Sequence, residues 1–294
     1  MKNYALSCCS TVDLTAEKLA ERQISWASFH YYLDGVEYLD DMFSSSMDAT
    51  TFYNKISLGA KTKTSQINIE EYLTYFEKLF LSYDEIVHLT QSSGLSGTYN
   101  NAKIAIDILK EKHPKKKIYL IDSLCASSGL GLLMDMLADK RDEGMTASEL
   151  CRYAEEIKRS IHINLYSTNI SFFIKGGRLS KAAGLVGNAL KICPNLYLNG
   201  DGKLVAGKKT CGKIKALKEL VSSMASTAIG GKEYNGKCFI SHSNCLDEAI
   251  KLKSFIEQEF KNLLGKIEIF SIGPTIGCHS GPGTVAIFFV GKPR

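Results

Sequence analysis

The alternation of hydrophobic and polar positions along the chain predicts short strands separated by helices. Apolar runs of about four to eight residues, closed by small or polar residues, are typical of buried strands. We expect strands at 4–9, 26–33, 85–90, 117–121, 163–167, 238–241, 267–270 and 284–290. Helical stripes lie between them, as at Tyr72, Phe76, Leu79 and Phe80. Alternation of this kind predicts an α/β fold with a mainly parallel sheet.

The length of the chain and a change in its sequence pattern near residue 160 predict two domains. With 294 residues it exceeds most single domains. Near residue 160 the regular alternation gives way to a hairpin pattern around 199–202, followed by the basic stretch 203–218. We therefore expect an N-terminal α/β domain at 1–159 and a C-terminal α/β domain at 160–294.

A loop of small residues, 92–98, separates a predicted buried strand from a predicted helix at 99–112. On that helix, Ile104, Ile108 and Leu109 stand at helical spacing. Glycine lets a ligand approach the backbone, and the free N–H groups of a helix N-terminus attract anions. The loop fits an anion-binding site, and it fits an ordinary turn capped by serine equally well. Ligands of parallel sheets sit beyond the carboxyl ends of strands, where this loop would lie.

Composition describes an ordinary globular protein. Hydrophobic residues make up 45% of the chain, charged residues 23%, and the net charge is +5. This charge is compatible with an anionic ligand and is far from that of a nucleic-acid-binding protein. We expect neither an integral membrane segment nor a secretory signal. Nine scattered cysteines without a CxxC pair indicate reduced thiols and a cytoplasmic location.

Two segments suggest phosphate or metal binding, but each lacks a feature that such a site requires. The segment 202–209 nearly matches the phosphate-binding GxxxxGK[ST] pattern, but Lys209 replaces the required hydroxyl. Four residues of metal-binding types lack recognisable ligand spacing: His242, Cys245, Cys278 and His279. We therefore expect no metal and no cofactor.

Two basic side chains beside glycines are candidates for contacts with an anion. His279 lies in the glycine-rich segment 277–283, which we expect to be a loop from which it reaches into an interdomain cleft. Arg178 follows two glycines and allows the same interpretation. The alternatives are that His279 forms hydrogen bonds with nearby backbone and that Arg178 is simply exposed to solvent. Cys278 and His279 are not expected to form a catalytic pair, because such pairs are assembled across a fold.

Four short motifs, taken in this order, resemble the DegV family, which includes the fatty-acid-binding FakB proteins of bacteria. They are the Thr-Ser-Gln at 64–66, the small-residue loop continued to 99, the Lys-Gly-Gly-Arg-Leu-Ser at 175–180, and the segment 277–283. The resemblance covers nearly the whole chain. It implies two α/β domains that hold a long-chain fatty acid between them, with the tail enclosed and the carboxylate near the surface of the cleft.

Carried over residue by residue, the resemblance implies six ligand-binding residues: Thr64, Ser65, Ser93, Gly94, Arg178 and His279. Of these, Thr64, Ser93 and His279 look like the family's carboxylate-binding residues. Hydroxyls, turn N–H groups and an imidazole can replace the water that a carboxylate loses, since charge-assisted hydrogen bonds are strong. Binding of this kind needs no catalytic residue.

The resemblance also implies a partner, because in better-understood members a kinase phosphorylates the bound acid for phospholipid synthesis. We therefore expect a non-enzymatic carrier with a fatty acid kinase as its partner, and the basic stretch 203–218 is a candidate docking surface. The alternative is an acyl- or phosphoryl-transfer enzyme in the same cleft, with Ser93 as nucleophile and His279 as base. Against it, the sequence offers no identifiable orienting carboxylate.

Two residues depart from the family's pattern. Cys9 stands where the family commonly has the aspartate of a Thr-Asp-Ser motif, and this loss of an acidic side chain predicts an altered head-group preference. Ile67 stands where a proline usually follows Thr-Ser-Gln, which mainly affects the stiffness of the loop.

Overall fold

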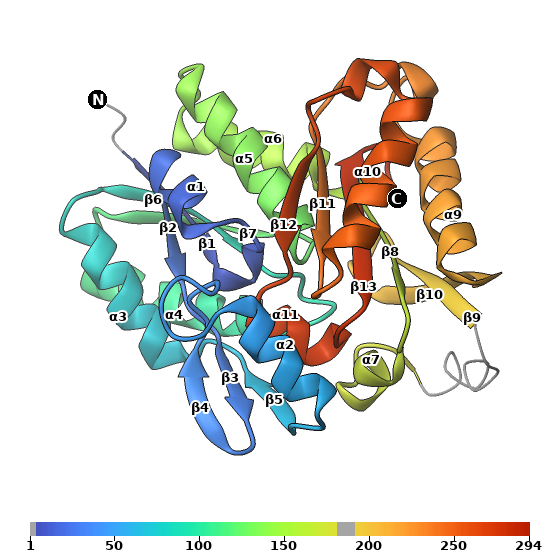
Figure 1. Cartoon of the computed structure of the whole chain (residues 1–294). Helices are drawn as coiled ribbons and strands as arrows, with labels where there is room; N and C mark the ends of the chain where they lie inside the picture. The colour runs from blue at the N-terminus through green and yellow to red at the C-terminus, as the bar shows by residue number, and fades with distance from the viewer. Residues whose placement is uncertain (1–3, 181–191) are drawn as a thin grey trace.

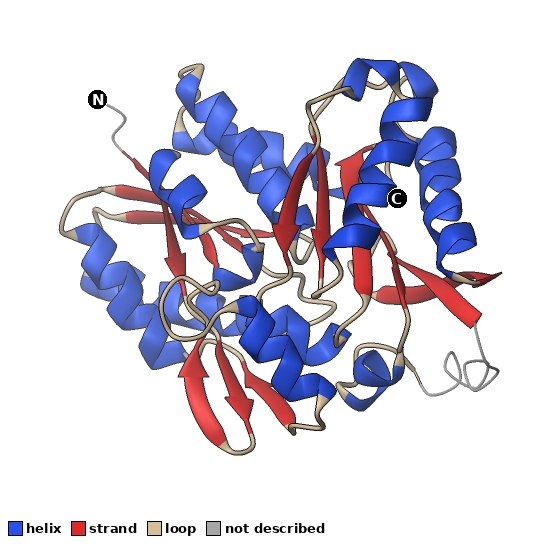
Figure 2. Cartoon of the chain, in the orientation of Figure 1, coloured by secondary structure: helices blue, strands red, loops and turns tan. Residues whose placement is uncertain are grey.

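The computed structural model describes residues 4–180 and 192–294, which form an α/β fold with two large sheets and one small sheet (Figure 1). Helices cover the outer faces of the large sheets and also lie between them (Figure 2). The α/β class predicted from the sequence is confirmed. Within the described ranges, no helix combines the length and the hydropathy that a membrane crossing requires.

The first large sheet and its helices come from the N-terminal half of the chain. The elements are β1 Tyr4–Cys9, η1 Ser10–Val12, α1 Ala16–Glu21, β2 Ile24–Ala27, α3 Ile69–Phe80, β6 Glu85–Thr90, α4 Thr98–Lys112, β7 Lys117–Asp122, α5 Ser128–Asp142 and α6 Ala147–Ile157. The strand order is β2-β1-β6-β7, and every pair is parallel. Since α3 and α4 cover one face and α5 and α6 the other, the central strands β1 and β6 are buried along almost their whole length.

The second large sheet comes from the C-terminal half. Its elements are η2 Lys158–Ser160, β8 Ile161–Ser167, β9 Ile192–Leu198, β10 Leu204–Cys211, α9 Lys213–Thr227, η3 Gly231–Glu233, β11 Cys238–His242, α10 Leu246–Glu259, η4 Lys261–Leu263, β12 Glu268–Ser271 and β13 Thr284–Val290. The order is β10-β9-β8-β13-β11-β12, and only β11 and β12 are parallel among these described pairs. The predicted hairpin is confirmed as β9 and β10, and α9 and α10 cover the outer face.

A small antiparallel sheet joins the two halves at one end of the molecule. It contains β3 His30–Leu33, β4 Val36–Leu39 and β5 Thr62–Ser65 in the order β4-β3-β5. Three short helices lie near it: α2 Ala49–Ser57, α7 Ser171–Lys175 and α11 Pro274–Ser280. Although α11 comes from the C-terminal half, it packs against β3, β5 and α2. This contact carries a C-terminal segment to the N-terminal strands.

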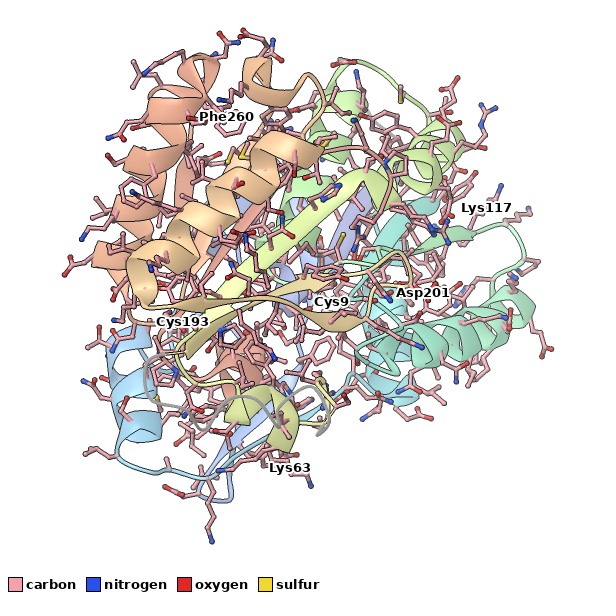
Figure 3. The ribbon with its side chains drawn as sticks, turned by 90° about the vertical axis from the view of Figure 1, so that its right-hand side faces the viewer. Cys9, Lys63, Lys117, Cys193, Asp201 and Phe260 are labelled. Carbon is pink, nitrogen blue, oxygen red and sulfur yellow. The ribbon has the colours of Figure 1, made fainter. Side chains whose placement is uncertain are left out.

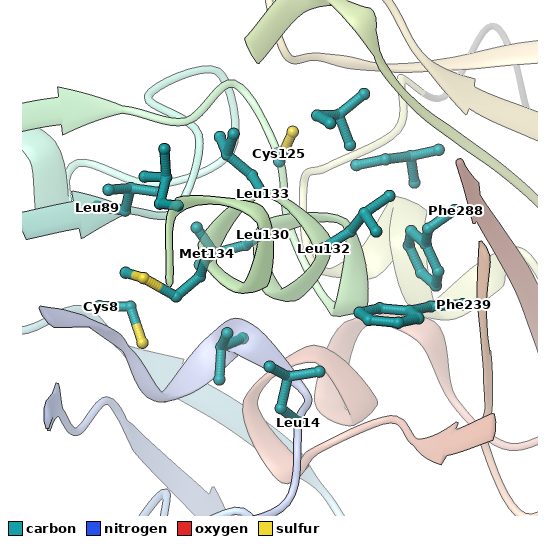
Figure 4. Packing of buried hydrophobic residues seen from close by; sticks show 14 of the residues in the cluster. Cys8, Leu14, Leu89, Cys125, Leu130, Leu132, Leu133, Met134, Phe239 and Phe288 are labelled. Atoms are coloured by element: carbon teal, nitrogen blue, oxygen red, sulfur yellow. The ribbon is translucent and has the colours of Figure 1, made fainter. Parts of the chain in front are cut away.

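The hydrophobic core is continuous between the two large sheets, with α5 at its centre. In Figure 4, Leu89 lies on one side of this helix, and Phe239 and Phe288 lie on the other. Two glycines permit this close packing. A Cβ on Gly129 would lie 2.5 Å from Cδ1 of Ile163, and a Cβ on Gly131 would lie 2.8 Å from Leu14. Glycine disfavours a helix interior, so its use here reflects close packing.

Three sequence predictions about local structure are wrong. The predicted strand 26–33 is divided between β2 and β3, because the second half pairs with β4 across the Asp34-Gly35 turn. The segment 61–66, where the sequence predicts no strand, contains β5, and the predicted loop 277–283 contains the end of α11. The predicted helix 99–112 is confirmed as α4, but Ile104 and Ile108 are 39% and 37% exposed. Its buried face is formed by Thr98, Ala102, Ala105, Ile106 and Leu109.

Candidate ligand-binding site

A cavity lies between the two halves of the molecule and contains about 720 Å³ of space free of protein atoms. This space includes a part that is open to solvent. Its wall is mainly apolar and includes Leu165 on β8, Phe173 on α7, Leu198 on β9 and Phe288 on β13. An apolar wall of this kind fits a hydrocarbon chain.

The polar end of the cavity is built where β5 meets α11. Thr64 Oγ1 and His279 Nε2 lie 2.8 Å apart, and both residues line the cavity. The side chain two positions earlier on the same strand, Thr62, donates to the carbonyl of Cys278 at 3.2 Å. Because side chains alternate along a strand, Thr62 and Thr64 share the face that holds α11. The alternate residue Ser65 is half-buried on β5, and it is not among the cavity-lining residues of the described chain.

Arg178 joins this polar end from the opposite half. Its Nε donates to the carbonyl of Leu95 at 3.1 Å, and its Nη1 donates to the carbonyl of Gly176 at 2.5 Å. Burial lowers the pKa of the guanidinium, which nevertheless stays charged at neutral pH. A Cβ on Gly176 would overlap Nδ1 of His279, so glycine is required for the imidazole to occupy this position.

His279 is neutral in the folded protein. Burial, followed by the positive charge of Arg178, lowers the pKa of its imidazole to about 3. Its Nε2 faces Thr64, whereas Nδ1 is buried and finds no hydrogen-bond partner among the residues that the structure describes. A neutral imidazole donates through one nitrogen and accepts through the other. When the proton is on Nε2, His279 can donate either to Thr64 Oγ1 or to an anionic head group bound beside it.

The loop 92–98 reaches the cavity through Leu95 and Ser96, and not through Ser93. Ser96 lines the cavity, and its Oγ accepts a hydrogen bond from the backbone of Thr98 at 3.2 Å, which leaves the hydroxyl proton free to donate. Ser93 is exposed and lies outside the cavity lining in the described structure; its backbone donates to Asp122 Oδ1 at 3.0 Å. Sequence reasoning missed Ser96, because nothing in the loop distinguishes its serines.

At Gly94, the backbone of the loop 92–98 lies close to the β9–β10 turn of the other half. A Cβ there would lie 2.7 Å from the carbonyl oxygen of Asp201 in the β9–β10 turn. Asp201 is labelled in Figure 3 at the end of this hairpin. In the same contact, Ser92 Oγ donates to the carbonyl of Gly202 at 2.8 Å. Gly94 therefore seats the loop against the hairpin, and the cavity wall of the described chain does not include it.

Cys9, where the sequence predicts an effect on head-group preference, is outside the described lining of the cavity. Cys9 is fully buried, its Sγ lies 3.5 Å from the hydroxyl of Tyr72, and burial raises the pKa of the thiol to about 11. The Tyr72 hydroxyl lies 2.9 Å from Thr98 Oγ1. The backbone N–H of Thr98 in turn donates to Ser96 Oγ. A chain of contacts through Tyr72 and Thr98 therefore links Cys9 to Ser96.

A basic groove opens outward from the polar end. Thr64, Arg178 and His279 line both the cavity and this groove, which contains about 950 Å³ of space and is also lined by Lys61, Lys63 and Lys175. Figure 3 shows Lys63 at the margin of the molecule. The three shared residues thus separate an apolar interior from a positively charged surface.

The arrangement does not assemble the elements of the alternative enzyme. His279 is brought to Thr64, while Ser93 is exposed outside the cavity. Across residues 4–180 and 192–294, no group of three or more His, Cys, Asp or Glu side chains is placed to hold a metal ion. What the site can do is bind an anionic head group beside an apolar tail.

Comparison with known proteins agrees with this geometry. The model of a family described as uncharacterised proteins of the DegV family matches residues 9–292. A DegV domain-containing protein of Clostridium perfringens is 32% identical over 294 residues, which cover 100% of this chain and 99% of that protein. The chain therefore belongs to the DegV family.

Solved structures share its fold over the full length. A fatty acid binding DegV family protein from Streptococcus agalactiae is 26% identical, with a TM-score of 0.83 over 99% of this chain and 100% of that chain. The Fatty Acid Kinase B3 protein of Streptococcus pneumoniae, whose structure is loaded with linoleic acid, is 21% identical, with a TM-score of 0.84 over 99% of this chain and 100% of that chain. The second likeness concerns the fold alone.

Proposed function

We propose that this protein binds a long-chain fatty acid, with the tail in the apolar cavity and the carboxylate at Thr64, Ser96, Arg178 and His279. One observation carries the proposal: polar and basic side chains gather at one end of an otherwise apolar cavity. Each methylene that enters the cavity contributes about 0.8 kcal/mol, and charge-assisted hydrogen bonds fix the head. The Streptococcus agalactiae relative, which is described as fatty acid binding, supports the same ligand class.

The head group would lie at the inner end of the basic groove. Lys61, Lys63 and Lys175 there attract an anion, and their position next to the carboxylate suits the transfer of a second anionic group to it. We extend the proposal to presentation of the bound acid to a fatty acid kinase in the cytoplasm. The protein would act as a carrier and not as the enzyme. Nine free cysteines agree with a reducing compartment.

The predicted docking surface 203–218 is less positively charged than its sequence suggests. Lys208 pairs with Glu219 at 2.7 Å, and Lys213 pairs with Glu248. The surface remains our candidate, and replacing Lys208, Lys209 and Lys213 with glutamine tests it. Acyl-phosphate formation with a partner kinase should fall, whereas the same change at Lys251 and Lys253 on α10 should leave it intact. Equal rates in both variants would remove 203–218 as the docking surface.

Ligand identity is tested directly by extracting the purified protein with organic solvent and analysing the extract by mass spectrometry. We expect one long-chain fatty acid per chain. A protein that neither retains a fatty acid nor binds added ones would refute the carrier. Turnover of an acyl ester by the protein alone, lost in Ser93→Ala, would instead support the enzyme.

A further inference from the structure

One polar group in the apolar cavity has no role in holding a carboxylate. Gln91 follows β6, is 7% exposed and lines the cavity. Its side-chain oxygen, Oε1, is buried, and no residue in the described ranges donates a hydrogen bond to it. Some other polar side chains that line the cavity are paired within the protein, whereas Thr275 Oγ1 and His279 Nδ1 also find no partner among the described residues. Ser127 donates to Asp13 Oδ2, and Thr284 Oγ1 lies 2.9 Å from Ser167 Oγ.

The chemistry of this oxygen defines its partner. An amide oxygen only accepts hydrogen bonds, so it needs a donor. Neither an ionised carboxylate nor a hydrocarbon tail has one. A plain fatty acid that fills the cavity would leave this buried oxygen unpaired, which is unfavourable. A hydroxyl on the chain would supply the missing donor.

The chemistry of Gln91, and not its position alone, separates it from the head group. Thr64, Arg178 and His279 line both the cavity and the basic groove, which identifies them as the boundary between the two. Gln91 contributes to the cavity, and among described residues it is not part of the groove lining. Ser96 lines only the cavity as well, so Gln91 is set apart by its chemistry: Ser96 can donate to a carboxylate, whereas Oε1 needs a donor from another part of the ligand.

We infer that the preferred ligand is a hydroxylated long-chain fatty acid, whose chain hydroxyl donates to Gln91 Oε1. The inference rests on the proposed function and narrows its ligand class. It makes Gln91 a specificity-determining residue. A site built to pair a hydroxyl rejects the analogue that lacks it more strongly than an apolar site rejects an added hydroxyl.

The experiment compares stearic acid with hydroxystearic acids that carry the hydroxyl at different positions, measured by calorimetric titration of the delipidated full chain. At least one positional isomer should bind about tenfold more tightly than stearic acid. In Gln91→Leu, this preference should disappear or reverse. Gln91→Met provides a second apolar variant, and circular dichroism checks that each variant is folded. Gln258→Leu, the same change at an exposed glutamine on α10, should keep the wild-type preference.

Three results would overturn the inference. The wild-type protein could bind every hydroxystearic acid no better than stearic acid, so that the amide merely holds water. Gln91→Leu and Gln91→Met could weaken all acids equally, which would place Gln91 at the head group. The preference could also persist in both variants. In each case binding of stearic acid still supports the carrier, whereas failure of every acid to bind would refute the proposed function itself.

Discussion

Thr64 Oγ1 and His279 Nε2 lie 2.8 Å apart although 215 positions separate the two residues in the sequence. Their meeting depends on α11, which leaves the C-terminal half and packs on the small sheet of the N-terminal half. The polar end of the cavity, where we propose that the head group binds, is therefore a junction between two parts of the fold. Changes that shift α11 should alter ligand binding even where they contact no ligand.

Ser96→Ala should weaken binding of a long-chain acid by about 1.5–3 kcal/mol, because the hydroxyl donates to a charged carboxylate. Ser93→Ala is the matched control from the same loop and should bind as the wild type does, since Ser93 is exposed outside the cavity. Titration with a fluorescent fatty acid measures both. The opposite order of effects would restore Ser93, as the sequence predicts, to the head-group site.

Gly176→Ala should destabilise the protein and weaken ligand binding, because the new Cβ would overlap Nδ1 of His279. Overpacking of this kind costs typically about 1–3 kcal/mol. Urea unfolding measures the loss. The same substitution in a His279→Ala background should cost much less, and equal costs in the two backgrounds would mean that the imidazole is not the obstacle.

Asp13→Asn should make stability less dependent on pH. Burial raises the pKa of Asp13 well above its ordinary value, and the nearby Asp40 adds to this effect. The unfolded chain therefore ionises at lower pH than the folded one, so this group's stabilising contribution is lost as pH rises through its folded pKa. Asparagine retains an acceptor for the backbone of Gly273, which donates to Asp13 at 3.0 Å. Urea midpoints between pH 4 and 8 should decline less steeply in Asp13→Asn.

His279→Gln should reduce acid sensitivity. The pKa of His279 is lowered from 6.5 to about 3, so the unfolded chain takes up a proton below about pH 6.5 that the folded protein refuses. The free energy of unfolding should fall as pH drops from about 6.5 towards 3, and this fall should be smaller in the variant. His113→Gln on the surface is the control. An unchanged slope in His279→Gln would contradict the buried, neutral imidazole.

Much of the fold could be predicted, because many strands of its large sheets are mainly apolar. The bounds predicted for β1, β6 and β13 agree with the structure. By contrast, the sequence of β5, Thr62–Ser65, contains no apolar residue. It is a strand because β3 offers a pairing edge, and that edge comes from elsewhere in the chain.

The candidate site could be predicted in part for a related reason. Motifs identified Thr64, Arg178 and His279, which the structure brings to one end of the cavity. They could not distinguish Ser96 from Ser93, since the difference depends on the turn of the loop and on the hydrogen bond from Thr98. Gln91 carries no motif. It is singled out by the unpaired oxygen Oε1, and this can be recognised only from the neighbouring residues in the folded structure.

The central position of α5 has a consequence for dissecting the protein. A fragment ending at residue 159 would keep this helix but lose Phe239 and Phe288, which pack on one side of it. Its apolar surface would then face water, and such surfaces promote aggregation. Although the sequence pattern changes near residue 160, the hydrophobic core continues across this position. We therefore expect the two halves to unfold and fold as one cooperative unit.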